Sequence, residues 1–258
     1  MTDQLFLRDA YALEAPAQIT EHTEEGGLVL NQSVFYATGG GQPGDTGSLS
    51  WQDGAGQHCL RIANTVKGPE GRIVLLPAAD QPLSGQPLLD QQNVEQPWPA
   101  VDQEVTQTLD WDRRFGHMRV HTALHLLSVV IPLPVSGGSI GAEKGRLDFN
   151  MPEAPADKQA LEDALNDLIT RDLPVSERWI SEEELDANPE LVKTMSVAPP
   201  RGNGRIRLVR IGSDEEQIDL QPCGGTHVRS TGEIGRIRLG KVEKKGKQNR
   251  RVYLHLNA

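Results

Sequence analysis

The apolar positions of the first hundred residues recur in short runs rather than in helical stripes. Residues 27–31 read GLVLN and residues 72–76 read RIVLL, and clusters of Gly, Pro and Asp separate such runs. Short apolar or alternating runs between turn residues are typical of β-strands. The pattern therefore predicts a small β-barrel domain over residues 1–100. The Pro- and Gln-rich stretch 81–100 is expected to be a loop or linker at its end.

The pattern changes after residue 100. A strand-like run at 105–109 leads into a helical stretch that Pro132 and Pro134 would end. A second helix is predicted over residues 156–172, because apolar residues recur there with helical period. They are Leu161, Leu165, Leu168 and Ile169.

The C-terminal third returns to a strand pattern. Ser181 and Glu184 have the spacing of a capping box, which predicts a short third helix. Beyond Pro199 and Pro200, strands are predicted over residues 205–211, 217–221, 234–243 and 250–256. Helices followed by strands predict a two-layer α+β domain over residues 101–258, so the fold class is α+β with an N-terminal β-barrel.

The amino-acid composition indicates the class of protein and its cellular compartment. Hydrophobic residues make up 37% of the 258 residues and charged residues 24%, which is ordinary for a soluble globular protein. No run approaches the ~20 apolar residues of a membrane span, and the N-terminus lacks the pattern of a signal peptide. With two cysteines a disulfide framework is not expected, so the prediction is a cytoplasmic protein without a membrane partner. Cys59 is expected to be a small core residue.

The charge is unevenly distributed. The net charge is −10, yet residues 201–210 and 229–251 together hold 13 of the 26 basic side chains and only 2 of the 36 acidic ones. A local positive patch can bind phosphates on an otherwise acidic protein, although a solvated strand face is an equally ordinary explanation.

Two pairs of potential metal ligands, one of two histidines and one of a cysteine and a histidine, carry the candidate chemistry. His121 and His125 are four residues apart in the predicted helix, so they project from one face, as two ligands of one metal ion do. The sequence PCGGTHV places Cys223 four residues before His227 in a glycine-bearing turn. One thiolate and three imidazoles suit Zn²⁺, and the prediction is a single zinc ion.

Other interpretations of the second pair stay open at this point. Cys223 could be a nucleophile with Gly224 and Gly225 supplying an oxyanion hole, but this leaves the 121/125 pair unexplained. A purely structural zinc is a stronger alternative, because four protein ligands close a tetrahedral site and hydrolysis needs an open position. A general metal esterase or peptidase of the HExxH type is disfavoured, because Thr122 stands where the glutamate would be.

Four motifs in order resemble those of one family. HTALHLL and CGGTHVRSTGEIG are similar to the editing domain of alanyl-tRNA synthetases and its free-standing relatives, the alanyl-tRNA editing proteins. FYATGGGQPGDTG resembles the glycine-rich signature of their N-terminal barrel, and DWDRRFGHMRVHTA their entry into the editing core. The segments PPRGNGRIRLVRIG and KVEKKGKQNRRV resemble the two-domain, free-standing form.

The resemblance implies a function. Members of the family deacylate tRNA(Ala) that carries serine or glycine, which a synthetic site shaped for a methyl group rejects poorly. No ATP-dependent activation module is apparent, so the chain is expected to act in trans on the acceptor end of tRNA(Ala). The zinc at His121, His125, Cys223 and His227 would position or activate a water, or else orient the substrate. A zinc-stapled tRNA-binding module without catalysis is the alternative.

The resemblance also points to further site residues. The side-chain-sensing residue of the family falls in VSGGSIG, where Ser136 is the first candidate and Ser139 the second; a plain Gly/Ser turn is the alternative. Asp45 could be a base, but a turn-forming role is favoured. The glycine-rich motif comprises Gly39, Gly40, Gly41, Gln42, Asp45 and Gly47. The candidates for acceptor-stem phosphates are Arg205, Arg207, Arg210, Lys244, Lys245, Lys247, Arg250 and Arg251.

Overall fold

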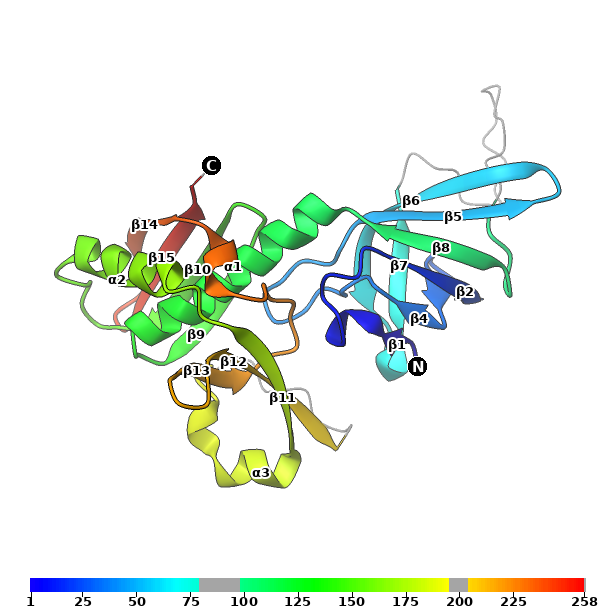
Figure 1. Cartoon of the computed structure of the whole chain (residues 1–258). Helices are drawn as coiled ribbons and strands as arrows, with labels where there is room; N and C mark the ends of the chain where they lie inside the picture. The colour runs from blue at the N-terminus through cyan, green and yellow to red at the C-terminus, as the bar shows by residue number, and fades with distance from the viewer. Residues whose placement is uncertain (79–97, 195–203, 258) are drawn as a thin grey trace. The chain divides into compact units, whose positions relative to one another are not determined.

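A computed structural model describes residues 1–78, 98–194 and 204–257 of the chain (Figure 1). The chain divides into two compact units. Unit 1 comprises Met1–Gly39 and Pro43–Arg114, and unit 2 comprises Gly40–Gln42 and Phe115–Ala258. The α+β fold class with an N-terminal barrel is confirmed.

Unit 1 is a closed barrel with the strand order β2-β3-β7-β6-β5-β8, in which neighbouring strands are antiparallel. Its strands are β2 (Glu14–His22), β3 (Leu28–Leu30), β5 (Gly47–Asp53), β6 (Gly56–Lys67), β7 (Ile73–Pro77) and β8 (Glu104–Leu109). A short parallel pair outside the barrel joins β1 (Asp3–Gln4) to β4 (Gln32–Ser33), and 3-10 turns occupy Leu5–Leu7 and Pro69–Gly71.

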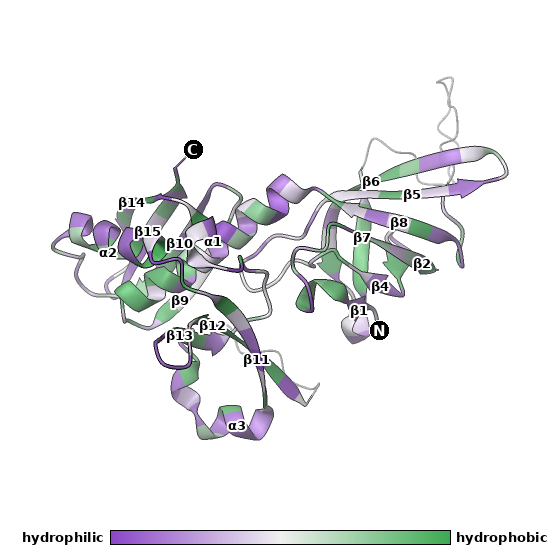
Figure 2. Cartoon of the chain, viewed as in Figure 1, coloured by the Kyte–Doolittle hydropathy of each residue, from purple (hydrophilic) through white to green (hydrophobic). Residues whose placement is uncertain are grey.

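Most strands of the barrel alternate between buried and more exposed positions, so that one face of each strand packs into the core. Figure 2 shows this alternation along β8, where Val105 and Leu109 are buried between more polar neighbours. The core includes Ile19, Phe35, Leu49 and other fully buried apolar side chains. The predicted domain boundary at residue 100 lies before β8, whereas the two units divide between Arg114 and Phe115, because β8 is itself a barrel strand.

Unit 2 is organised around helix α1 (Trp111–Val130), which begins in unit 1 and ends before Pro132, as predicted. From Gly116 onward most of its side chains are buried, both polar ones such as His117 and Thr122 and apolar ones. The apolar ones include Met118, Val120, Ala123, Leu124, Leu126 and Leu127. None of the helices among the described residues is long and apolar enough to cross a membrane.

Two antiparallel sheets complete unit 2. One has the order β14-β15-β10-β9 and the other the order β11-β12-β13. The strands are β9 (Val135–Ile140), β10 (Lys144–Asn150), β11 (Val175–Ser181), β12 (Arg205–Gly212), β13 (Gln217–Pro222), β14 (Ile237–Lys244) and β15 (Asn249–Leu256). The remaining helices are α2 (Lys158–Thr170), α3 (Glu182–Ala187) and 3-10 turns at Pro189–Leu191 and Thr231–Ile234.

Most predicted elements are confirmed, with two corrections. The helix predicted over 156–172 is α2, and the capping box of Ser181 and Glu184 begins α3. The alternative interpretation of VSGGSIG as a turn is wrong, because Val135–Ile140 form β9 and pair with β10. Cys59 is exposed on β6 rather than in the core. The predicted linker lies for the most part outside the described residues, which resume at residue 98.

Candidate metal centre

Helix α1 presents two imidazoles on one face. His121 and His125 lie one turn apart, their ring centroids are 5.2 Å apart, and both are buried. The ring of His227 lies against both, with centroid distances of 4.2 Å to His121 and 4.6 Å to His125. The sequence motif of residues 121–125 therefore faces a third imidazole from more than a hundred residues further along the chain.

The loop after β13 supplies the fourth side chain. The Sγ atom of Cys223 lies 3.5 Å from Nε2 of His121 and 3.3 Å from Nε2 of His227. Gly225 is required here, because a Cβ atom at this position would lie 2.2 Å from Cε1 of His121. The glycine thus allows the loop to pass close enough to the helix for its side chains to meet the two histidines.

The four side chains fit a zinc site. Their candidate ligand atoms all lie within 4.8 Å of one another. A tetrahedral zinc with bonds of about 2.3 Å to sulfur and about 2.0 Å to nitrogen places S and N about 3.5 Å apart. The two Sγ–Nε2 distances agree with this value. The arrangement also disfavours the nucleophile interpretation, because a nucleophile needs one base and this thiol faces a cluster of three imidazoles.

Each histidine of the cluster has a hydrogen-bond partner on its Nδ1 atom. Nδ1 of His121 lies 3.1 Å from Oε1 of Gln42, and Nδ1 of His125 lies 3.0 Å from Oδ2 of Asp219. Nδ1 of His227 lies 3.1 Å from Oγ1 of Thr122. Because the Thr122 hydroxyl donates its single proton to the carbonyl of Met118, the histidine is the donor in that pair. With Nδ1 protonated, Nε2 is the atom left to bind a metal.

The partner of His125 is part of a larger polar network. Asp219 is buried, and its carboxylate also accepts from Lys193 Nζ and from Gln221 Nε2 at 2.7 Å. Carboxylate–histidine–metal arrangements of this kind orient the ring and increase its basicity. Asp219, Gln221 and Cys223 follow each other at every second position along β13 and its end. The alternation places these three side chains on one face of the strand, but nothing in the sequence alone connected Asp219 with His125, 94 positions away.

The pKa values of the cluster reflect its close packing. Burial disfavours the Cys223 thiolate, but His121 and His227 outweigh this and hold the pKa of the thiol well below its ordinary value. Burial and the neighbouring His121 lower the pKa of His227 well below its usual range. Burial opposes a charge on His125 as well, yet Asp219 and Cys223 raise its pKa to about 9. The lowered pKa of Cys223 favours its thiolate and the lowered pKa of His227 favours its neutral imidazole, which are the states in which these two side chains bind zinc.

Arg207 is hydrogen-bonded to the loop that carries Cys223 and His227. Its side chain is buried, and Nη1 donates to the carbonyls of Cys223 and Gly225, each at 2.8 Å. Nη2 is paired with Glu177. Arg207 was expected among the phosphate-binding residues, and this internal position favours a structural role instead.

The other basic residues expected to contact tRNA differ in their surroundings. Arg205 is exposed at the start of β12, and Lys244, Lys245 and Lys247 are exposed around the β14–β15 turn. Three arginines are held by partners within the chain: Arg210 by Asp214, Arg251 by Asp148, and Arg250 by the carbonyl of Pro152.

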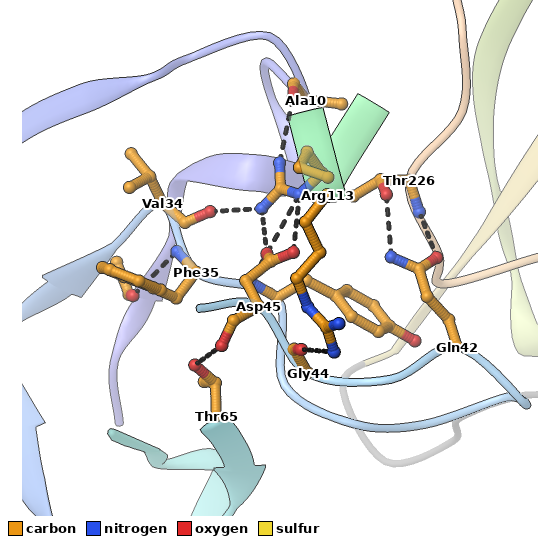
Figure 3. Close-up of polar contacts among 12 residues, drawn as sticks. Ala10, Val34, Phe35, Gln42, Gly44, Asp45, Thr65, Arg113 and Thr226 are labelled. Atoms are coloured by element: carbon orange, nitrogen blue, oxygen red, sulfur yellow. Dashed lines mark hydrogen bonds and ion pairs between the residues drawn. The ribbon is translucent and has the colours of Figure 1, made fainter. Parts of the chain in front are cut away.

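The glycine-rich motif is divided between the two units. Gly40, Gly41 and Gln42 belong to unit 2, whereas Gly39, Asp45 and Gly47 belong to unit 1. Asp45 is buried and paired with Arg114, and it accepts from the backbone N–H of Tyr36 at 2.6 Å (Figure 3). This fixed position favours the structural role of Asp45 over that of a base.

The two candidate sensing serines lie on β9. The Ser136 hydroxyl donates to the carbonyl of Asp148 at 3.2 Å and is half-buried. Ser139 is exposed and pairs with Arg146 across the strands. The carbonyl of Gly41 accepts from the N–H of Ile140 at 2.8 Å, so the glycine-rich loop runs beside this strand.

Comparison with known proteins identifies the family. Residues 206–253 match the second additional domain of threonyl and alanyl tRNA synthetases. An alanyl-tRNA editing protein AlaX-M of Methanosarcina barkeri is 33% identical over 261 residues, and the match covers 99% of this chain and 99% of that protein. The chain belongs to the AlaX-M family of alanyl-tRNA editing proteins.

Further relatives agree with the AlaX-M assignment. The AlaX-M protein of Saccharolobus solfataricus is 32% identical over 257 residues, with 98% of both chains covered. An alanine–tRNA ligase of Pyrobaculum calidifontis is 34% identical over 252 residues, which cover 94% of this chain but 25% of the ligase. The resemblance seen in the sequence motifs is thereby confirmed.

Proposed function

We propose that this AlaX-M protein hydrolyses mischarged tRNA(Ala) in trans, releasing serine from Ser-tRNA(Ala) and, as a second substrate, glycine from Gly-tRNA(Ala). The observation that carries the proposal is the convergence of one thiol and three imidazoles within 4.8 Å, in a chain that matches alanyl-tRNA editing proteins over its full length. The names of these relatives and the limited selectivity of a synthetic site for small side chains support this choice of substrate.

The ion proposed for the cluster is a single Zn²⁺ held by His121, His125, Cys223 and His227. When bound, zinc lowers the pKa of a bound water to about 7 and polarises an ester carbonyl. The three histidines are buried and Cys223 is partly exposed, so water and the ester would approach from the side of Cys223. Hydrolysis in this arrangement requires a fifth ligand or a protein ligand that yields.

The protein side chains have the remaining tasks. The Nδ1 partners hold the imidazoles in the tautomer that binds metal, and Arg207 fixes the loop that carries Cys223. Phosphates of the acceptor end are proposed to contact Arg205 and the exposed lysines of the β14–β15 turn, with Arg210, Arg250 and Arg251 as further candidates. Ser136, or Ser139 in its place, is proposed to sense the serine hydroxyl, and the glycine-rich loop beside β9 would form part of the same surroundings.

A non-catalytic tRNA-binding module is the second candidate function, and the set of four protein ligands favours it, because such a set closes a structural zinc site. Deacylation of Ser-, Gly- and Ala-charged tRNA(Ala) separates the two. The enzyme should release serine and glycine, leave alanine bound, and lose activity in His121→Ala and Cys223→Ala.

Cys59→Ala is the matched control for the thiol, because Cys59 is an exposed cysteine on a barrel strand. It should retain full activity. Serine release that is undiminished in verified metal-free protein would contradict the proposed role of zinc. Binding of tRNA without any release of serine would leave the module as the function.

The sensing role is tested by comparing two substrates. Ser136→Ala should lose more activity on Ser-tRNA(Ala) than on Gly-tRNA(Ala), because glycine offers no hydroxyl to the Ser136 side chain. Ser139→Ala is the parallel variant on the same strand. An equal loss on both substrates for both variants would remove the sensing role from β9.

A further inference from the structure

Gln42 lies in unit 2 although the residues next to Gly40–Gln42 on either side belong to unit 1. Its side chain is fully buried. The preceding residue, Gly41, has a φ of +83°, and a Cβ atom there would lie 3.0 Å from the carbonyl oxygen of Gly138. Glycine therefore permits both the backbone turn and the close approach to β9 that place Gln42 beside the metal-binding side chains.

The orientation of the Gln42 amide is determined by its surroundings. The backbone N–H of Thr226 can only donate, and it lies 3.2 Å from Oε1 of Gln42. Nε2 of Gln42 donates to Oγ1 of Thr226 at 2.9 Å (Figure 3). Oε1 is therefore an acceptor, and the contact of 3.1 Å with His121 requires a proton on Nδ1 of that ring.

One amide thus touches both halves of the candidate metal site. Oε1 accepts from His121 on helix α1 and from Thr226, which stands between Cys223 and His227 in the loop. Gly225 leaves the space for this contact, since a Cβ atom there would lie 2.9 Å from Oε1. Removing the amide would leave two buried donors without a partner, which is costly in the interior of a protein.

We propose that Gln42 is a positioning residue of the metal centre: it fixes the Nδ1–H tautomer of His121 and joins the helix that carries HxxxH to the loop that carries CxxxH. The glycine-rich motif then serves to place the Gln42 amide beside His121 and Thr226. The inference builds on the proposed zinc site but not on deacylation, so its test is made on metal binding in the absence of tRNA.

The experiment measures metal affinity of the full chain by chelator competition with Zn²⁺, and the absorption spectrum of the Co²⁺-substituted protein. Gln42→Leu keeps the size of the side chain and removes the acceptor. Loss of a hydrogen-bond partner of a ligating histidine lowers metal affinity by about 10–100-fold. Gln42→Glu retains an acceptor for Nδ1–H and should recover most of the affinity and the wild-type cobalt spectrum.

Gln107 provides a matched control. It is also a fully buried glutamine, its Oε1 accepts from the N–H of Val34 at 2.9 Å, and its Nε2 donates to the carbonyl of Gln32 at 3.1 Å, all within the barrel. Gln107→Leu should lower the melting temperature and leave the zinc affinity and cobalt spectrum unchanged.

Two results would overturn the proposal: a zinc affinity of Gln42→Leu equal to that of wild type, or equal losses in Gln42→Leu and Gln107→Leu. If Gln42→Leu does not fold, Gln42→Asn gives the same comparison, because it keeps the amide but is too short to reach both His121 and Thr226. Failure of the deacylation assay alone would leave this result standing, so the two proposals fail separately.

Discussion

Buried carboxylates in this chain take their roles from their partners. Asp219 accepts from His125, Lys193 and Gln221 and so belongs to the candidate metal centre. Asp45 is equally buried, but its oxygens are occupied by Arg114 and by the N–H of Tyr36 in the barrel. A carboxylate held in this way by a buried guanidinium stabilises the fold.

The structural role of Asp45 predicts a loss of stability. Asp45→Ala leaves Arg114 buried without its counter-charge, which should lower the free energy of unfolding by about 3–5 kcal/mol. Urea or thermal unfolding measures this directly. Asp53→Ala is the control, because Asp53 is a more exposed aspartate of the same barrel, paired with His58, and its replacement should have a much smaller effect. A stable Asp45→Ala protein that has lost hydrolysis would instead favour a base.

The sequence was sufficient to predict the four candidate ligands but not their hydrogen-bond partners. His121 and His125 are recognisable by helical spacing, and Cys223 and His227 by a short motif, because both signals are local. Gln42 contacts a histidine that is 79 positions away and Asp219 contacts one 94 positions away. The tertiary fold brings such distant residues together, and no periodicity in a single sequence predicts these contacts.

At the scale of elements, strand β9 shows how pairing overrides local propensity. Its sequence, VSGGSI, contains two glycines that disfavour a strand in isolation. Pairing with β10 from Val135 to Ile140 nevertheless forms it, with a register shift between Asp148 and Phe149. The boundaries of strands with alternating apolar residues were predicted within a few positions, because the alternation itself shows which face of the strand is buried.

The β10–β15 pairing predicts a pH dependence of stability. Partial burial would raise the pKa of Asp148, but Arg251 and Arg146 outweigh it and lower the pKa below its ordinary value. The group therefore stabilises the fold above its unfolded pKa of about 3.9, and this contribution is lost as the pH falls through the lower folded pKa. Asp148→Asn should melt at a lower temperature than wild type near neutral pH.

The difference between Asp148→Asn and wild type should shrink as the pH falls from about 5 to about 2. Melting temperatures at successive pH values measure it. Asp214→Asn is the control, because Asp214 is largely exposed although it pairs with Arg210; its effect should be small throughout. A difference between Asp148→Asn and wild type that stays constant down to pH 2 would contradict the linkage.

The β14–β15 turn predicts salt-dependent binding of tRNA. Lys244, Lys245 and Lys247 are exposed there. Each phosphate contact contributes about −0.9 to the slope of log K against log salt on a duplex. Replacing one contacting lysine by alanine should therefore weaken binding and reduce the slope by about that amount. Arg8→Ala, an exposed charge on the barrel, should change neither; unchanged slopes in all three lysine variants would exclude the turn.

At the scale of the whole molecule, each of the two units is built from two separate segments of the chain. The predicted boundary at residue 100 assumed that each domain is one continuous segment. Gly40–Gln42 instead belongs to unit 2, and helix α1 begins in unit 1 and continues in unit 2. A composition shift cannot reveal a three-residue exchange of this kind. It does mean that every candidate metal ligand, and each residue hydrogen-bonded to a ligand's Nδ1, lies in unit 2.

This division predicts where metal stabilises the chain. A ligand at about 100 times its Kd stabilises the state that binds it by about 2.7 kcal/mol. Removal of metal should therefore reduce hydrogen-exchange protection in peptides of unit 2, above all around α1 and β13, because their side chains form the cluster. Peptides from β5 and β6 of the barrel should be nearly unchanged.

Cys223→Ala should show the reduced protection in unit 2 with or without chelator, whereas Cys59→Ala should behave as wild type. If the barrel lost as much protection as unit 2, the metal would be stabilising the chain as one cooperative unit. The prediction that metal stabilises unit 2 alone, which rests on the position of the ligands, would then be contradicted.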